Sequence, residues 1–167
     1  MYSGEVLCGT EIMEGRGSLI SMDDGTLKEG YWKNNLLHGR ARTYYKSGSY
    51  YEGQYVVGIR EGPGVFTWTK NDRYFGDYKN GKKEGLGRET WSDGRKYEGQ
   101  YVADKKHGFG LYTWPNGNRY EGDFVSDRKE GNGTIHHKDG SKFKGTFKNN
   151  VQSGPGTITA RDGWVID

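Results

Sequence analysis

A strict 23-residue repeat constrains this chain more than any other feature. Its aromatic anchors recur at constant intervals: Tyr51, Tyr74, Tyr97, Tyr120 and Phe143. Glycines keep the same phase two, eleven and thirteen positions after each anchor, as in Gly53, Gly62 and Gly64. Periodicity of this kind indicates one supersecondary unit stacked many times over.

The repeat divides the chain into units of one predicted array, 1–167. The boundaries are an irregular first unit, 1–25, and regular units 26–48, 49–71, 72–94, 95–117, 118–140 and 141–163. The first unit carries insertions before Lys28, and the last loses a ring at Ala160. We therefore expect the two ends of the array to depart from the repeat.

Each unit is predicted to hold two short antiparallel strands. The first passes through segments such as Tyr51 to Tyr55, and the second through segments such as Gly62 to Trp68. A turn that contains Gly58, or its equivalents Gly81 and Asp104, joins the two. An Asp-Gly or Asn-Gly pair ends most units, and such pairs supply the positive φ of tight turns. The expected fold is an all-β, elongated, single-layer twisted antiparallel meander.

Rings and glycines are predicted to form the core in place of aliphatic side chains. Aromatic residues make up 14% of the chain, which separates it from disordered sequences, and 29 residues are glycine. Alternation places Tyr51, Gly53 and Tyr55 on one face of a strand, and Gly62 and Gly64 on the same face of the next. We expect each ring to lie over bare glycine backbone, where a Cβ would push it away.

The repeat unit contains, in order, the motifs YEGxY/F, GxxxGxG, W and DG. This pattern resembles the MORN repeat (membrane occupation and recognition nexus). The resemblance covers residues 2 to about 163, with Lys28 and Ala41 as departures in the second unit. It implies an elongated single-layer sheet. It also implies a scaffold of the kind found in radial-spoke heads of cilia, junctophilins and cytoskeletal complexes, or beside the catalytic domains of some lipid kinases.

The ring face is the first candidate site, as a groove for a partner protein such as an amphipathic helix. Its residues form rows at constant repeat phase: Tyr55, Tyr78, Tyr101, Phe124, Trp68, Trp91 and Trp114. A sheet without a second layer leaves part of its ring area exposed, and exposed apolar surface favours binding. The alternative interpretation is that every ring is used in packing on its neighbouring glycines.

A ladder of cations near the hairpin turns is the second candidate site. Its members are Lys82, Lys83, Lys105, Lys106, Arg128 and Lys129. The repeat would stack them along one edge, where they would bind anionic phospholipid. The alternative is a solvated edge that prevents aggregation, and Glu61, Glu84 and Glu130 in the same turns reduce its charge.

The composition argues against several other functions. A net charge of +3 is small for a nucleic-acid-binding protein. One cysteine, Cys8, gives neither a disulfide framework nor a cysteine metal site. His136 and His137 are adjacent and would point to opposite faces of a strand. We predict no cofactor, no metal and no enzymatic activity.

The sequence therefore predicts a non-catalytic protein-interaction scaffold in the cytoplasm. The expected setting is a ciliary, axonemal or cortical cytoskeletal assembly, which rests on the resemblance alone. Two alternatives stay open: a peripheral adaptor on anionic membranes, and the targeting array of a larger enzyme. Homodimerisation through the ring face or the terminal strands also stays open.

Overall fold

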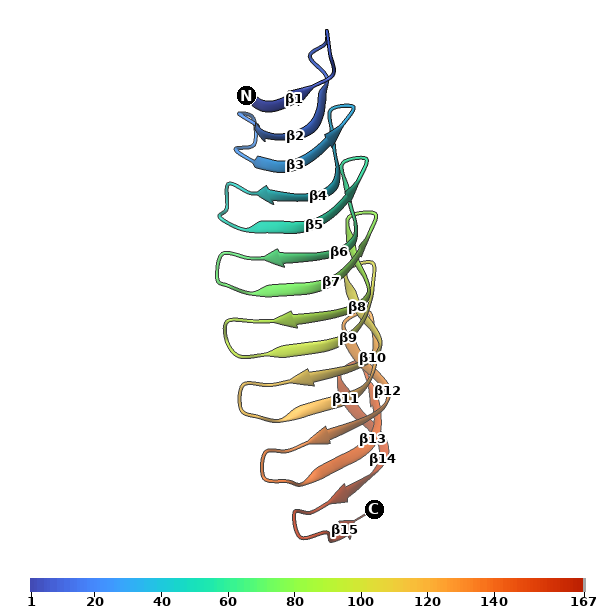
Figure 1. Ribbon diagram of the computed structural model, residues 1–167. Coiled ribbons are helices and arrows are strands. Elements are labelled where there is room, and N and C mark those ends of the chain that lie inside the picture. The colour runs from blue at the N-terminus through green and yellow to red at the C-terminus, as the bar shows by residue number, and fades with distance from the viewer. Residues whose placement is uncertain (167) are drawn as a thin grey trace. The chain divides into compact units, whose positions relative to one another are not determined.

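The fold prediction is confirmed by a computed structural model, which describes residues 1–166. Fifteen strands follow one another in chain order as an open antiparallel meander (Figure 1). No helix occurs among residues 1–166. The chain divides into two compact units, Met1–Lys82 and Lys83–Asp167.

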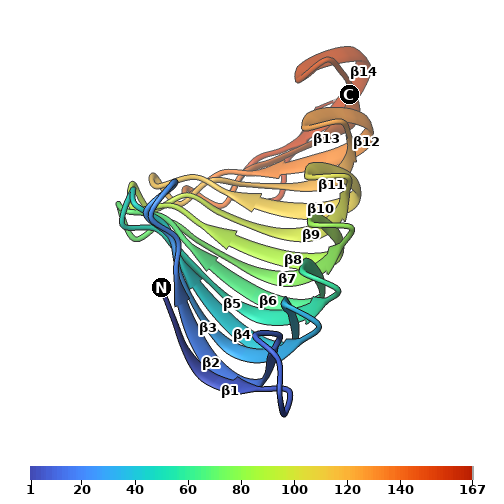
Figure 2. The same ribbon diagram turned by 90° about the horizontal axis from the view of Figure 1, so that it is seen from above.

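The first unit contains seven strands. They are β1 (Tyr2–Val6), β2 (Met13–Ile20), β3 (Leu27–Lys33), β4 (Leu36–Tyr44), β5 (Tyr50–Val56), β6 (Ile59–Thr67) and β7 (Arg73–Lys79). Each pairs antiparallel with the next. Seen from above, these strands fan out from one another, as the twist of a β-sheet requires (Figure 2).

The second unit contains the remaining strands. They are β8 (Lys82–Thr90), β9 (Lys96–Val102), β10 (Lys105–Thr113), β11 (Arg119–Val125), β12 (Arg128–His136), β13 (Lys142–Lys148), β14 (Val151–Thr159) and the short β15 (Val165–Ile166). They also pair in chain order.

The predicted packing of rings on glycines is confirmed within both units. In the first, Gly53 and Gly64 lie opposite one another, and a Cβ on either would overlap the ring of Tyr51. In the second, a Cβ on Gly110 would lie 2.6 Å from Cε2 of Tyr97. The exposed fraction of both tyrosines is 0%.

Gly62 and its equivalents were wrongly assigned to this ring packing. Gly62 has a φ of 76°, and a Cβ there would meet only the side chain of Gln54, at 3.8 Å. It lies in a β-bulge. Gly64 pairs with Gly53 and Arg60 pairs with Tyr55, so β6 advances four residues where β5 advances two. This glycine is required by backbone conformation, because L-residues rarely adopt such φ values. The bulge also places the start of the second strand at Ile59, three residues before the predicted Gly62.

Two-residue turns, with positive φ at both residues, join the strands of the hairpins from β3–β4 to β13–β14, whereas residues 7–12 connect β1 to β2. Val57 and Gly58 form such a turn, with φ values of 50° and 75°. Asn80 and Gly81 fill the equivalent turn of the next hairpin. Valine is strained here, because a β-branched side chain crowds the backbone at positive φ.

We expect Val57→Asn to raise the free energy of unfolding by about 1 kcal/mol, since asparagine tolerates the left-handed region better. Urea unfolding followed by circular dichroism measures the change. Val56→Asn is the matched control, because Val56 is also exposed, at 46% against 59% for Val57, but precedes the turn, within β5. Equal effects of the two substitutions would argue against strain at Val57.

Candidate functional site

The first row of predicted partner-binding rings is buried. Tyr55, Tyr78, Tyr101 and Phe124 have exposed fractions of 5%, 4%, 1% and 3%. Each packs edge-on against the anchor ring four positions before it, as Tyr120 does against Phe124 at 5.3 Å between centroids. Burial raises the pKa of Tyr55 to about 12. These side chains hold the sheet together, and they offer little surface to a partner.

The tryptophan row is more exposed and continuous. In the second unit Trp91 follows β8, Trp114 follows β10, and Tyr112 lies between them near the end of β10; all three are half-buried. The ring centroids are 6.1 Å apart for Trp91 and Tyr112 and 5.0 Å apart for Tyr112 and Trp114. Trp68 belongs to the first unit, where its ring lies 4.6 Å from that of Phe66. Trp91, Tyr112 and Trp114 are called the tryptophan row below.

Lysines support the tryptophan row on the ring face. The ammonium of Lys106 lies 5.1 Å from the centroid of Trp91, and that of Lys129 lies 4.3 Å from the centroid of Trp114. A cation over the face of an indole ring is attracted by the ring quadrupole. Burial lowers the pKa of Lys129. These contacts restrict the rings, so a ligand would meet an ordered surface.

The predicted cation ladder is divided by strand alternation. Lys83, Lys106 and Lys129 turn toward the ring face, whereas Lys82, Lys105 and Arg128 are exposed. The six side chains therefore do not form one continuous edge. Adjacent strand residues point to opposite faces, and this rule, applied to each pair, would have separated them. Lipid binding through the exposed three stays a prediction.

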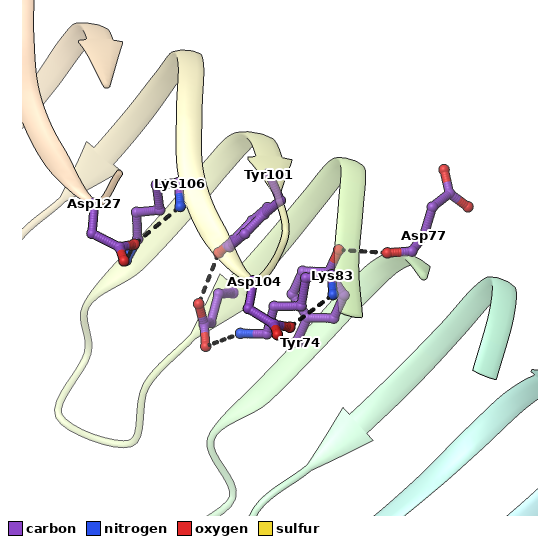
Figure 3. A network of polar contacts seen from close by, with 8 residues as sticks. Tyr74, Asp77, Lys83, Tyr101, Asp104, Lys106 and Asp127 are labelled. Carbon is purple, nitrogen blue, oxygen red and sulfur yellow. Dashed lines mark hydrogen bonds and ion pairs between the residues drawn. The ribbon is translucent and has the colours of Figure 1, made fainter. Parts of the chain in front are cut away.

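A buried polar cluster joins Lys83 of β8 to the next hairpin (Figure 3). Nζ of Lys83 lies 2.7 Å from Oε1 of Glu89, and the hydroxyl of Tyr101 donates to Oε2 of the same carboxylate at 2.7 Å. The exposed fractions of the Lys83 and Glu89 side chains are 13% and 10%. Glu89 was not among the predicted site residues. Its repeat position could have identified it, because a carboxylate there replaces the aromatic residues Phe66 and Tyr112 of other units.

The acidic residues beside the turns connect successive hairpins. Oε2 of Glu84 accepts a hydrogen bond from the backbone N–H of Ala103 in the next turn, at 3.0 Å. Oδ1 of Asp104 in that turn accepts from the N–H of Lys83, at 2.8 Å. Glu61 and Glu130 accept equivalent bonds from Asn80 and Asn149. These carboxylates therefore position the turns as well as reducing the local charge.

Residues 1–166 contain no group of three or more His, Cys, Asp or Glu side chains placed to hold a metal ion. Within the same residues there is no helix long and apolar enough to cross a membrane. Cys8 is exposed.

Comparisons with known proteins identify the repeat. The family model described as MORN repeat matches six segments: 29–50, 51–73, 74–94, 97–119, 120–142 and 143–165. Similar solved structures include the TCP domain of SAS-4 (dCPAP) from Drosophila melanogaster, in complex with a proline-rich motif of Ana2. It is 16% identical, with a TM-score of 0.58, over 98% of this chain and 94% of that chain. The wild-type TCP10 domain of Danio rerio CPAP is 14% identical, with a TM-score of 0.31, over 92% and 88% of the two chains. At such identities a likeness shows the fold alone.

Proposed function

The chain belongs to the MORN repeat family, and we propose that it is a non-catalytic scaffold that holds a proline-rich segment of a partner protein on its tryptophan row. The proposal rests on one observation: the rings of Trp91, Tyr112 and Trp114 contact one another in a continuous row and are only half-buried, whereas the rings beside them are buried. Proline-rich segments are recognised by surfaces lined with aromatic side chains.

The spacing of the row suits such a segment. Trp91 and Trp114 occupy the same repeat phase two strands apart, which corresponds to about 9.6 Å at ~4.8 Å per strand. A polyproline II helix repeats every three residues, or about 9.3 Å. A proline-rich segment that crosses the strands would therefore present the same side to each repeat. The similar SAS-4 domain was solved with a proline-rich motif, which supports this class of ligand.

Two features of the row suit this ligand. The indole N–H of tryptophan is a hydrogen-bond donor, and a polyproline II backbone keeps its carbonyl groups free to accept. Lys106 and Lys129 lie against the rings and hold them in place. A rigid ligand on an ordered surface loses little conformational entropy on binding. Recognition of this kind requires no catalytic group.

The cellular setting we propose is a cytoskeletal assembly, with the cilium and axoneme as the specific expectation. The fold likeness to a domain of the SAS-4 (dCPAP) protein is compatible with a scaffold. Proteins that co-purify with the tagged chain in low and in high salt would identify the assembly. A fixed set of cytoskeletal proteins that survives high salt is expected. Recovery of membrane material alone, lost at high salt, would favour the lipid adaptor instead.

We expect Trp114→Ala to weaken binding of a proline-rich peptide at least tenfold, because buried tryptophans dominate the energetics of such interfaces. Fluorescence anisotropy of a labelled PxxP peptide measures the affinity. The matched control is Leu86→Ala, which removes a side chain that is 69% exposed and lies on the opposite face. Equal affinity of the wild type and Trp114→Ala for the peptide would exclude the tryptophan row as its site.

A further inference from the structure

A groove of about 960 Å³ lies on the face of the second unit opposite the rings. It crosses β10 to β14, and its floor runs along one line of backbone that contains four glycines in register: Gly122, Gly133, Gly145 and Gly156. A side chain at any of these positions would point to the ring face, so the floor of the groove is backbone and the neighbouring side chains form its walls. Thr134 and Thr157 flank Lys144 across the strands and supply hydroxyl groups near the floor.

One wall of the groove is basic. His136 pairs with Arg119 on one side and with Lys142 on the other, so three basic side chains lie next to one another across β11, β12 and β13. Like charges placed opposite one another destabilise a sheet. Burial, together with Arg119 and Lys142, lowers the pKa of His136. Glu121 is the one acid that lines the groove, 3.6 Å from Nε2 of His136.

The other wall carries apolar side chains at its ends. Phe109, on β10, is 55% exposed, and Pro155, on β14, is also exposed. Both line the groove, and they occupy the same repeat phase. The four strand spacings between them correspond to about 19 Å, which an extended segment of about six residues spans. Asn132 and Thr146 lie between them on the same wall.

The two walls are complementary to an extended peptide segment in which acidic side chains alternate with apolar ones. Alternate residues of an extended segment point to opposite sides. Acidic side chains on one side would meet Lys142 and Lys144, which line the groove, and among residues 1–166 neither of these cations has an ion pair. Apolar side chains on the other side would cover Phe109 and Pro155. Glu121 makes the groove less suited to a dense polyanion such as a nucleic acid.

We propose that this groove binds an extended segment of a partner protein in which acidic and apolar residues alternate. The inference does not depend on the tryptophan row, which belongs to the opposite face. A scaffold with both sites would join two different partner segments through one sheet.

The test uses the full chain and a labelled peptide of alternating glutamate and valine, with a lysine-and-valine peptide as its counterpart. We expect only the acidic peptide to bind. The double variant Lys142→Gln, Lys144→Gln should weaken its binding at least tenfold. The matched control, Lys96→Gln with Lys105→Gln, removes two exposed lysines outside the groove and should leave the affinity unchanged. Thermal unfolding of both double variants checks that each one folds.

The pH dependence of this binding gives a second readout. His136 faces Arg119 and Glu121 of β11 and Lys142 of β13. A bound carboxylate favours the protonated imidazole, so the affinity should rise as the pH falls from 7.5 to about 6. His136→Gln should remove most of this dependence.

Several outcomes would overturn the proposal. They are equal binding of the two peptides, equal affinity of the wild type and the groove variant, and binding to phosphatidylserine vesicles but to neither peptide. Trp114→Ala should leave binding of the acidic peptide unchanged. Failure of this site is therefore distinguishable from failure of the tryptophan row.

Discussion

Gly110→Ala is expected to lower the free energy of unfolding by about 3 kcal/mol, because overpacking of a close-packed site has costs of this order. The added Cβ would lie 2.6 Å from both Cε2 and Oη of Tyr97. Tyr97 is fully buried, and its hydroxyl donates to the carbonyl of Gln100 at 2.9 Å, so the ring has little room to move. Backbone strain does not contribute, because the φ of Gly110 lies outside the left-handed region.

A bulge glycine supplies the control for this substitution. Gly39 has a φ of 78°, and a Cβ there would meet no atom within 4 Å. Gly39→Asn should therefore cost no more than about 1 kcal/mol, since asparagine tolerates this conformation. Urea unfolding of the two variants gives the comparison. A smaller loss for Gly110→Ala than for Gly39→Asn would mean that the ring of Tyr97 can move away, and that ring packing does not require glycine.

Glu89→Ala is expected to have a comparable effect, about 3 kcal/mol, because removal of one partner of a buried ion pair leaves the remaining charge with its desolvation penalty. The substitution removes the carboxylate that faces the ammonium of Lys83 and accepts the hydrogen bond from Tyr101. The hydroxyl of Tyr101 loses this hydrogen bond in the same step, which adds to the cost.

The chain itself supplies the compensating variant. Two units later, Lys129, Ile135 and Phe147 occupy the repeat phases of Lys83, Glu89 and Tyr101. The double variant Glu89→Ile, Tyr101→Phe copies that arrangement, removing the hydroxyl together with the carboxylate and filling the site with an apolar side chain. It should recover more than half of the stability lost in Glu89→Ala, as judged by urea unfolding. An equal recovery in the double variant Glu89→Ala, Tyr101→Phe would show that the lost hydrogen bond matters more than the charge and the packing.

The sequence by itself determined the repeating part of this structure. Strand and turn signals recur with a fixed period, and side chains alternate along a strand by local geometry. These two regularities were enough to predict the meander and the ring of Tyr97 over Gly110. They did not reveal the bulge at Gly62, because a glycine required for positive φ and a glycine required for ring contact look the same in a sequence.

Only the tertiary structure decided which surfaces remain available. In the sequence, Tyr101 with its equivalents in other repeats and the tryptophan row were predicted to form one aromatic face. Packing between successive hairpins buries Tyr101 and its equivalents but leaves the tryptophan row half-exposed. Arg119, His136 and Lys142 lie on three successive strands, and the strand register places them side by side. Period and alternation are local properties, whereas exposure and the contents of a groove depend on how neighbouring strands pair and bend. That is the physical reason why the sequence predicted the fold but not the groove.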